Sequence, residues 1–535
     1  MTDWGNLWPA LRLESHYGDR VVPCFQDRPN SLYQLLVHAV AQNTKGDALV
    51  CGADRLSYAQ LQQQSSRLAT GLYKRGVKAG DRVAMLLGNR NEFVVTLYAL
   101  AHLGAIAVPI SIREQAPGLA YMLSHCAAVM VIHEADLACL LPSAQDAPNL
   151  QHRVSMAPCQ GSKLYEQLLE DGECPPVAAV AQEDTAVILY TSGTTGRPKG
   201  AMLTHLSIVH SSLHYQIGMS LGKHDNSIAA VPLSHVTGLI AMITTFTLAA
   251  GKLVIMPSFK AAEFLKLAEK EAMTHTLMVP AMYNLCLLQS DFDSYNLSGW
   301  RIGAFGGAPM PVATIERLAQ TVPTLMLMNC YGSTETTSPS TLMPPGQTTA
   351  HNDTVGMPLG CVEMRVMDDK GCEVPANVLG EIWIKGPQVV PGYWENPEAT
   401  QENFTAGFWH SGDIGSMDAN GYVKVVDRKK DMINRGGYKI YTIEVENALY
   451  AHSAVQECAV VSKPCPVLGE RVHAFVMLKT PGDLEIELRE FCRTRLSDYK
   501  VPESFTISTT PLPRNANGKL VKRDMRDQLL KSLVA

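Results

Sequence analysis

Short apolar runs of strand length alternate with longer, helix-like runs over much of this chain, from Arg82 to Ser333. The short runs include RVAMLLGNR, VMVIHEA, TAVILY, SIAAVPLS, KLVIMP, HTLMVP, RIGAFGG and LMLMNCYG. Such runs are typical of strands buried on both faces, and helical segments between them suit crossover connections. One such segment, NEFVVTLYALAHLG, predicts a helix that ends at Gly104. The alternation therefore predicts an α/β domain with mixed sheets flanked by helices.

The pattern changes after about Asp353. Short strands separated by turn residues follow in EMRVMDDKG, GEIWIKGP and GYVKVVDR, which predict a β-rich subdomain. Helix and strand patterns then mix over about a hundred residues, enough for a separate small α+β domain. The charged stretch DRKKDMINRGGYKI lies between the β-rich part and the mixed helix and strand part. We therefore expect a large N-terminal domain at 1–427 and a small C-terminal domain at 428–535.

Composition narrows the class of protein. A chain of 535 residues is too long for one ordinary core, and 46% hydrophobic with 18% charged residues indicates a folded protein. A net charge of -6 gives no reason to expect nucleic acid or an anionic membrane as partner. The most apolar stretch, Val236 to Gly251, is short for a membrane span and predicts a buried helix. The N-terminus shows no signal peptide pattern, so we expect a cytoplasmic protein.

The 13 cysteines include no C-x-x-C pair and are scattered through apolar stretches, as at Cys51, Cys286 and Cys330. This distribution predicts buried free thiols in a reducing compartment and no zinc site.

The segment YTSGTTGRPKGAMLTH, from Tyr190 to His205, has the composition of a phosphate-binding loop. We expect a strand before it and a helix after it, with Thr204 as the N-cap. Glycines, hydroxyls and a lysine could surround an anion: Thr191, Ser192, Gly193, Thr194, Thr195, Gly196, Lys199 and Gly200. Pro198 separates the segment from the P-loop pattern. The residues alone predict an anion-binding loop, with a polar surface turn as the alternative.

This segment resembles the phosphate-loop signature of the adenylate-forming superfamily, which includes acyl-CoA ligases, luciferase-like enzymes and adenylation domains of peptide synthetases. Further motifs similar to those of the family follow in order out to Lys519, so the resemblance covers nearly the whole chain. It implies that a carboxylate attacks the α-phosphate of ATP, in the presence of Mg²⁺, to give acyl-AMP and pyrophosphate. A thiol, usually coenzyme A, then displaces AMP. The C-terminal domain is expected to be mobile between these steps.

The resemblance also assigns the nucleotide site. In NCYGSTE, Tyr331 is expected to stack on adenine, Thr334 to meet the phosphate and Glu335 to bind Mg²⁺. A strand-end loop with a solvated Glu335 is the alternative from the residues alone. The expected ATP and AMP ligands are Thr191, Ser192, Gly193, Thr194, Thr195, Gly196, Lys199, Gly307, Ala308, Pro309, Asn329, Tyr331, Gly332, Thr334, Asp413 and Arg428.

The expected catalytic residues are Lys519, Thr191, His235 and Glu335. A cation at Lys519 would offset the repulsion between the incoming carboxylate and the α-phosphate. A solvated lysine is the alternative from the residues alone. Asp413 and Arg428 are expected on the ribose and its phosphate.

The resemblance assigns the remaining roles as follows. The acyl pocket is expected at His235, Ala304, Gly306 and Gly332. Nothing large can stand at a glycine, so a flat ligand could lie on the backbone there. Lys430 matches the family's hinge, and Gly437 its tunnel for the pantetheine arm of coenzyme A. Pro391, Thr442 and Cys465 depart from the family's usual Met, Pro and Asp.

Gly332 stands where acetyl-CoA synthetases carry a tryptophan that closes the pocket, which favours a longer or ring-bearing acid. We expect a medium- or long-chain fatty acid; an aryl or branched acid, or loading of a carrier protein, is the alternative. A non-enzymatic nucleotide-binding protein is disfavoured because the chain retains Lys199, Glu335, Asp413, Arg428 and Lys519 together. The sequence leaves open whether the protein forms a homodimer.

Overall fold

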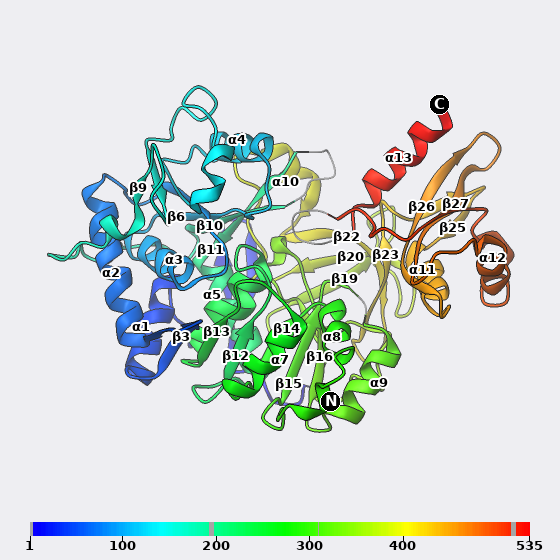
Figure 1. Ribbon diagram of the computed structural model, residues 1–535, viewed down its shortest axis with the longest axis horizontal. Coiled ribbons are helices and arrows are strands. Elements are labelled where there is room, and N and C mark those ends of the chain that lie inside the picture. The colour runs from blue at the N-terminus through cyan, green and yellow to red at the C-terminus, as the bar shows by residue number, and fades with distance from the viewer. Residues whose placement is uncertain (1–3, 192–196, 309, 515–519, 535) are drawn as a thin grey trace. The chain divides into compact units, whose positions relative to one another are not determined.

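The computed structural model describes residues 4–191, 197–308, 310–514 and 520–534 (Figure 1). These fall into two compact units, each described here by itself. The first contains Met1–Met364, Trp383–His410 and Asn420–Val423, and the second contains Arg365–Ile382, Ser411–Ala419 and Lys424–Ala535. The expected boundary between residues 427 and 428 stays a prediction.

A seven-stranded sheet in the first unit has the order β11-β10-β6-β5-β7-β8-β9. Its strands are β5 (Arg82–Leu86), β6 (Ile106–Pro109), β7 (Met130–His133), β8 (His152–Ser155), β9 (Lys163–Leu164), β10 (Thr185–Thr191) and β11 (Lys199–Thr204). Helices α2 (Tyr58–Lys74) and α3 (Asn91–Leu103) pack with Val83 and Met85 of β5, while α4 (Ala116–His125) packs with Ala84 and Leu86. Both faces of β5 are therefore buried, as its continuous apolar run predicts.

A nine-stranded sheet has the order β18-β17-β16-β15-β14-β12-β13-β3-β4. Its strands are β3 (Asp47–Cys51), β4 (Asp54–Ser57), β12 (Asn226–Ala229), β13 (Lys252–Ile255), β14 (His275–Met278), β15 (Ile302–Gly306), β16 (Met326–Tyr331), β17 (Thr341–Leu342) and β18 (Met357–Pro358). The six strands from β16 to β3 pair in parallel. One face packs against α7 (Ala261–Lys270), α8 (Pro280–Leu287) and α9 (Val312–Thr321), and the other against α1 (Leu32–Asn43) and α5 (His205–Gly218).

The segment after the expected phosphate loop corrects one prediction. Residues 199–204 form strand β11, which pairs with β10 in antiparallel fashion, so the loop joins two strands of a hairpin rather than a strand and a helix. The reason is that β10 offers β11 a complete hydrogen-bonding edge, which residues 199–204 occupy before α5 begins. The expected N-cap is confirmed, because the Thr204 side chain accepts a hydrogen bond from Ser207 N.

Two further helix predictions are confirmed. Helix α3 ends at Gly104, whose φ of 66° is a left-handed conformation that glycine favours. The apolar stretch 236–251 contains a buried helix, with a π-helical part at Thr237–Thr244 followed by α6 (Thr245–Leu248). Among the described residues, no helix combines the length and apolarity needed to cross a membrane.

The remaining strands of the expected β-rich part form a five-stranded sheet, β19-β20-β22-β21, with β23 on β22. Its elements are β19 (Glu363–Met367), β20 (Gly380–Lys385), α10 (Pro397–Asn403), β21 (Phe404–Thr405), β22 (Phe408–Met417) and β23 (Val423–Arg428). Near the N-terminus, β1 (Leu11–His16) and β2 (Arg20–Phe25) form a hairpin. Short 3₁₀ helices lie at Ala135–Leu140, Tyr165–Leu168, Phe292–Ser294, Thr334–Thr336 and Asp498–Lys500.

The C-terminal part is α+β, as predicted. Its sheet has the order β25-β24-β27-β26, with β28 on β27. The elements are β24 (Ile433–Arg435), β25 (Tyr438–Ile440), α11 (Thr442–Tyr450), β26 (Val455–Cys465), β27 (Gly469–Leu478), α12 (Glu485–Arg493), β28 (Ser504–Ser508) and α13 (Lys522–Val534). Helices α11 and α12 pack on one face of the sheet, and α13 packs on the other.

Candidate active site

The carboxylate of Glu335 accepts hydrogen bonds from three side chains at the expected nucleotide site. Glu335 lies in the 3₁₀ turn that follows β16, and only 7% of the residue is exposed. Its Oε1 accepts hydrogen bonds from Thr191 Oγ1 at 3.3 Å and from the Tyr393 hydroxyl at 3.0 Å. Its Oε2 accepts one from Ser333 Oγ at 2.6 Å. The fold therefore brings together two expected site residues, Thr191 and Glu335, that are 144 positions apart. The alternative of a solvated Glu335 is wrong.

Tyr393 is a site residue that the sequence reasoning missed. An antiparallel bridge joins Tyr393 to Ala201, and Trp394 N donates to Gly200 O at 2.7 Å, so this segment lies along β11. Burial and the neighbouring Glu335 raise the pKa of the Tyr393 hydroxyl, which keeps it protonated as a donor. In the sequence, only the tyrosine of PGYW pointed to a possible site residue. Its hydrogen-bond partner, Glu335, is 58 positions away, so the sequence did not connect the two.

Lys199 brings a positive charge to the same place. It is the first residue of β11, lies directly opposite Thr191 in the strand pairing, and has its Nζ 5.1 Å from the Tyr393 ring centroid. Thr191 Oγ1 also lies 3.5 Å from the Lys199 carbonyl oxygen. The Lys199 cation and the buried Glu335 carboxylate both lie beside Tyr393, and such a pair suits a phosphate together with its metal ion. Ser192, Gly193, Thr194, Thr195 and Gly196 lie outside the described residues.

The donor set at Glu335 fits Mg²⁺. This ion prefers oxygen ligands and is usually bound by one or two carboxylates together with substrate phosphates. Elsewhere among the described residues, Glu14, His16 and Cys24 offer ligand atoms within 4.8 Å of one another. A hydrogen bond from Arg28 helps to lower the pKa of Glu14 to about 2, so an arginine already holds that carboxylate.

The two glycines of the expected acyl pocket are explained by backbone contacts. A Cβ added at Gly306 would lie 2.4 Å from the Cys330 carbonyl oxygen on the paired strand β16. A Cβ at Gly332 would lie 3.2 Å from backbone atoms of residues 338–340. Ala304 is fully buried, and its carbonyl oxygen accepts a hydrogen bond from Tyr283. The contacts at Gly306 and Gly332 account for glycine at these two positions without any ligand, so the roles in an acyl pocket stay predictions.

The other expected residues of this unit lie at strand and helix ends. Gly307 and Ala308 are exposed just after β15, and Pro309 lies outside the described residues. Asn329 Nδ2 donates to the Thr354 carbonyl oxygen at 3.2 Å, and Tyr331 ends β16. Thr334 begins the 3₁₀ turn that holds Glu335.

His235 precedes the π-helical segment. Its Nδ1 accepts a hydrogen bond from Thr237 N at 3.3 Å. A neutral imidazole that accepts at Nδ1 carries its proton on Nε2. His235 can therefore present a donor at Nε2.

The second unit holds Asp413 and Arg428 as a pair. Arg428 Nε lies 2.8 Å from Asp413 Oδ1, with Asp413 4% exposed and the Arg428 side chain 48% exposed. Lys430 follows in an exposed turn after β23. Gly437 has a φ of 94° in the turn between β24 and β25, a left-handed conformation that favours glycine. Lys519 lies outside the described residues.

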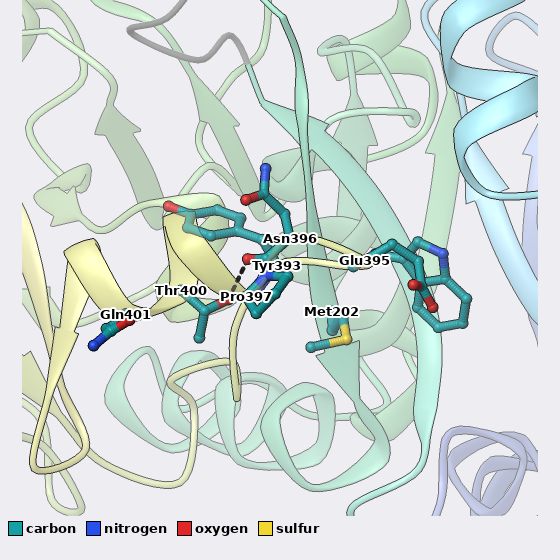
Figure 2. A pocket seen from close by; sticks show the side chains of 8 residues that line it. Met202, Tyr393, Glu395, Asn396, Pro397, Thr400 and Gln401 are labelled. Carbon is teal, nitrogen blue, oxygen red and sulfur yellow. Dashed lines mark hydrogen bonds between the residues drawn. The ribbon is translucent and has the colours of Figure 1, made fainter.

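A cavity of about 490 Å³ lies beside β11 (Figure 2). Its lining residues are Met202, Tyr393, Trp394, Glu395, Asn396, Pro397, Thr400 and Gln401. Tyr393 N donates to Thr400 Oγ1 at 3.0 Å on its border. Tyr393 thus contributes both to this cavity and, through its hydroxyl, to the Glu335 cluster.

Comparison with known proteins identifies the family. A model of the AMP-binding enzyme family matches residues 36–394, and a model of the AMP-binding enzyme C-terminal domain matches residues 444–519. The chain belongs to the AMP-binding enzyme family. Within it, the chain falls in the acyl-CoA ligase branch, the acid–thiol ligases that form AMP. The family, the fold class and the ligase class expected from the sequence are confirmed, as are ATP, Mg²⁺ and coenzyme A as the ligands of the family.

Relatives of this branch align over almost the full chain. A feruloyl-CoA synthase from Amycolatopsis sp is 34% identical over 89% of this chain and 94% of its own. A long-chain-fatty-acid–CoA ligase from Salmonella typhimurium is 30% identical over 98% of each chain. The structure of o-succinylbenzoate coenzyme A synthetase from Bacillus subtilis with ATP and a magnesium ion has a TM-score of 0.82 and 27% identity, covering 93% of this chain and 99% of that one.

Proposed function

We propose that this ligase activates a medium- or long-chain fatty acid and transfers it to coenzyme A. The observation that carries the adenylation half is the cluster in which Thr191 and Tyr393 donate to the buried Glu335 carboxylate beside Lys199. The fatty acid is supported by the end-to-end similarity to a long-chain-fatty-acid–CoA ligase. The similarity to a feruloyl-CoA synthase favours an aryl acid as the second candidate.

The proposed roles in the first step follow from charge. Glu335 would hold Mg²⁺, which neutralises phosphate charge when bound, and the Tyr393 hydroxyl keeps this carboxylate in position. Lys199 and the loop after Thr191 would bind the phosphates that depart as pyrophosphate. An oxygen of the substrate carboxylate forms a bond to the α-phosphorus while the bond to the β-phosphate oxygen breaks. Lys519 offsets the charge that builds up between the two anions.

The remaining roles concern the acid and the second step. His235 would donate from Nε2 to the substrate carboxylate, in an acyl pocket that Ala304, Gly306 and Gly332 keep open. Tyr331 would stack on adenine and Thr334 would meet the phosphate. The other expected ATP and AMP ligands nearby are Gly307, Ala308, Pro309, Asn329 and Gly332. Asp413 and Arg428 would bind the ribose and its phosphate. Lys430 would be the hinge, and Gly437 would line the path of the thiol.

A panel of acids tests this function. The protein is mixed with ATP, Mg²⁺, coenzyme A and either fatty acids of increasing length, branched acids or hydroxycinnamic acids, and the products are identified by mass spectrometry. We expect fatty acyl-CoA thioesters over several chain lengths, because an apolar pocket discriminates by only about 1–3 kcal/mol per methylene. A preference for hydroxycinnamic acids would establish the second candidate instead. Acyl-AMP without any CoA thioester would indicate a carrier-loading enzyme.

A further inference from the structure

Thr442, which stands where the family usually has proline, makes contacts that a proline could not make. It is the first residue of α11 and is fully buried. Its backbone N donates to Asp427 Oδ2, and its Oγ1 donates to Asp427 Oδ1 at 3.0 Å. Proline has neither an N–H nor a hydroxyl. Both contacts to the Asp427 carboxylate are therefore particular to a residue such as threonine.

Lys522, at the start of α13, extends this contact. Its Nζ donates to Thr442 Oγ1 at 2.7 Å and lies 2.8 Å from Glu446 Oε1. The Lys522 side chain is only 16% exposed. The Thr442 hydroxyl thus accepts from the lysine and donates to Asp427, which joins α13 to the end of β23 by a continuous hydrogen-bonded chain.

A second contact joins the same helix to the same stretch of chain. Arg526 Nη2 lies 3.4 Å from Asp431 Oδ1. Lys522 and Arg526 are four positions apart on α13 and therefore share one face of the helix. Lys522 reaches Asp427 through Thr442, and Arg526 contacts Asp431. These two aspartates lie on either side of Arg428 and Lys430 in the sequence.

The apolar side of α13 fixes the helix on the sheet. Met525 and Leu529 pack with Val461 of β26 and Phe475 of β27. The helix (red in Figure 1) is thus held by its apolar side and, through Lys522 and Arg526, by its charged side.

We propose that α13 acts as a clamp in which Thr442, Lys522 and Arg526 are positioning residues for acyl-AMP formation. The clamp holds the stretch from Asp427 to Asp431, which carries the expected ribose contact Arg428, and it would open for a movement about the expected hinge Lys430. In the sequence, Lys519 precedes Lys522, the anchored first residue of α13, by three positions. This inference rests on the proposed roles of Lys519 and Arg428 in the first half-reaction.

The two half-reactions provide the test. Acyl-AMP formation is measured as pyrophosphate release in a single turnover, and thioester formation is measured separately from purified acyl-AMP and coenzyme A. We expect Thr442→Val and Lys522→Met to slow acyl-AMP formation about tenfold or more, because a small misplacement of a catalytic group is costly. Thioester formation should change little, because Lys519 serves only the first step. Equal losses in both steps would overturn the proposal, since they indicate a loosened fold.

Two further variants sharpen the test. Thr442→Ser keeps the hydroxyl and should restore acyl-AMP formation. Arg523→Met removes a cation from the same helix whose side chain is 61% exposed, and it should leave both steps unchanged. If Lys522→Met fails to fold, the comparison of Thr442→Val with Thr442→Ser decides, because it alters no charge. Equal rates in those two variants would overturn the proposal.

Lys519→Ala separates the clamp from the underlying function. Lys519→Ala could abolish acyl-AMP formation while Thr442→Val and Lys522→Met form acyl-AMP as fast as the unsubstituted protein. In that case only the clamp proposal is wrong. If Lys519→Ala leaves acyl-AMP formation intact, the proposed role of Lys519 is wrong, and the clamp falls with it.

Discussion

At the scale of single residues, the proposed chemistry depends on a carboxylate that is almost completely buried and accepts several hydrogen bonds. Glu335 accepts hydrogen bonds from Thr191, Ser333 and Tyr393. Hydrogen bonds to the charged form offset part of the cost of burying it. Each donor therefore also sets the direction in which the carboxylate oxygens face.

Tyr393→Phe removes one donor and keeps the ring beside Lys199. Leaving a buried oxygen without its donor costs about 1–3 kcal/mol. We expect weaker Mg²⁺ binding, seen as a higher Mg²⁺ concentration required for acyl-AMP formation, with the fold retained. Tyr295→Phe removes an exposed tyrosine–carboxylate hydrogen bond, to Asp291, and serves as the control. Identical Mg²⁺ titrations for the two variants would contradict the role given to Tyr393.

At the scale of elements, the parallel sheet explains Gly306, a residue that the family resemblance assigns to the acyl pocket. Strands β15 and β16 pair with Gly306 opposite Cys330. The close approach of the Cys330 carbonyl oxygen leaves no room for a side chain at Gly306. A glycine in such a motif can therefore serve the sheet and the site together.

Gly306→Ala should destabilise the protein by about 1–3 kcal/mol, because the new methyl group meets backbone rather than a side chain that could move aside. Urea unfolding measures the difference. Gly299→Ala is the matched control: its nearest contact would be Met273 O at 3.5 Å, an ordinary distance. A Gly306→Ala variant as stable as the control would show that the two strands can separate without cost.

The elements also show what could be predicted from the sequence. Continuous apolar runs predicted the parallel strands because burial on both faces leaves that pattern in the sequence. Strand β11 was missed because Gly200, Ala201 and Met202 carry no clear period. Tyr393 was missed because its contact with Glu335 depends on how distant segments meet, which local pattern does not encode.

At the scale of the whole molecule, buried histidines tie stability to pH. Burial lowers the pKa of His210 and of His275 to about 3, and it lowers that of His214 well below the ordinary 6.5. The unfolded chain therefore binds protons that the folded chain excludes. The stability that this difference contributes is complete above about pH 6.5 and is lost as the pH falls below that value.

His214→Leu should reduce this loss, since neither ring nitrogen of His214 has a hydrogen-bond partner among the described residues. We expect a smaller drop in melting temperature between about pH 7 and about pH 5 than in the unsubstituted protein. His38→Leu, at an exposed position of α1, is the control and should not flatten the profile. Parallel profiles for all three proteins would contradict the contribution of His214.

The hairpin of β10 and β11 has a consequence for protein engineering. Strand pairing sets Thr191 directly opposite Lys199, so the spacing between these two residues is determined by the sheet and not by the segment that connects them. Designs that alter the chemistry at this site can therefore treat Thr191 and Lys199 as two anchor positions of fixed register.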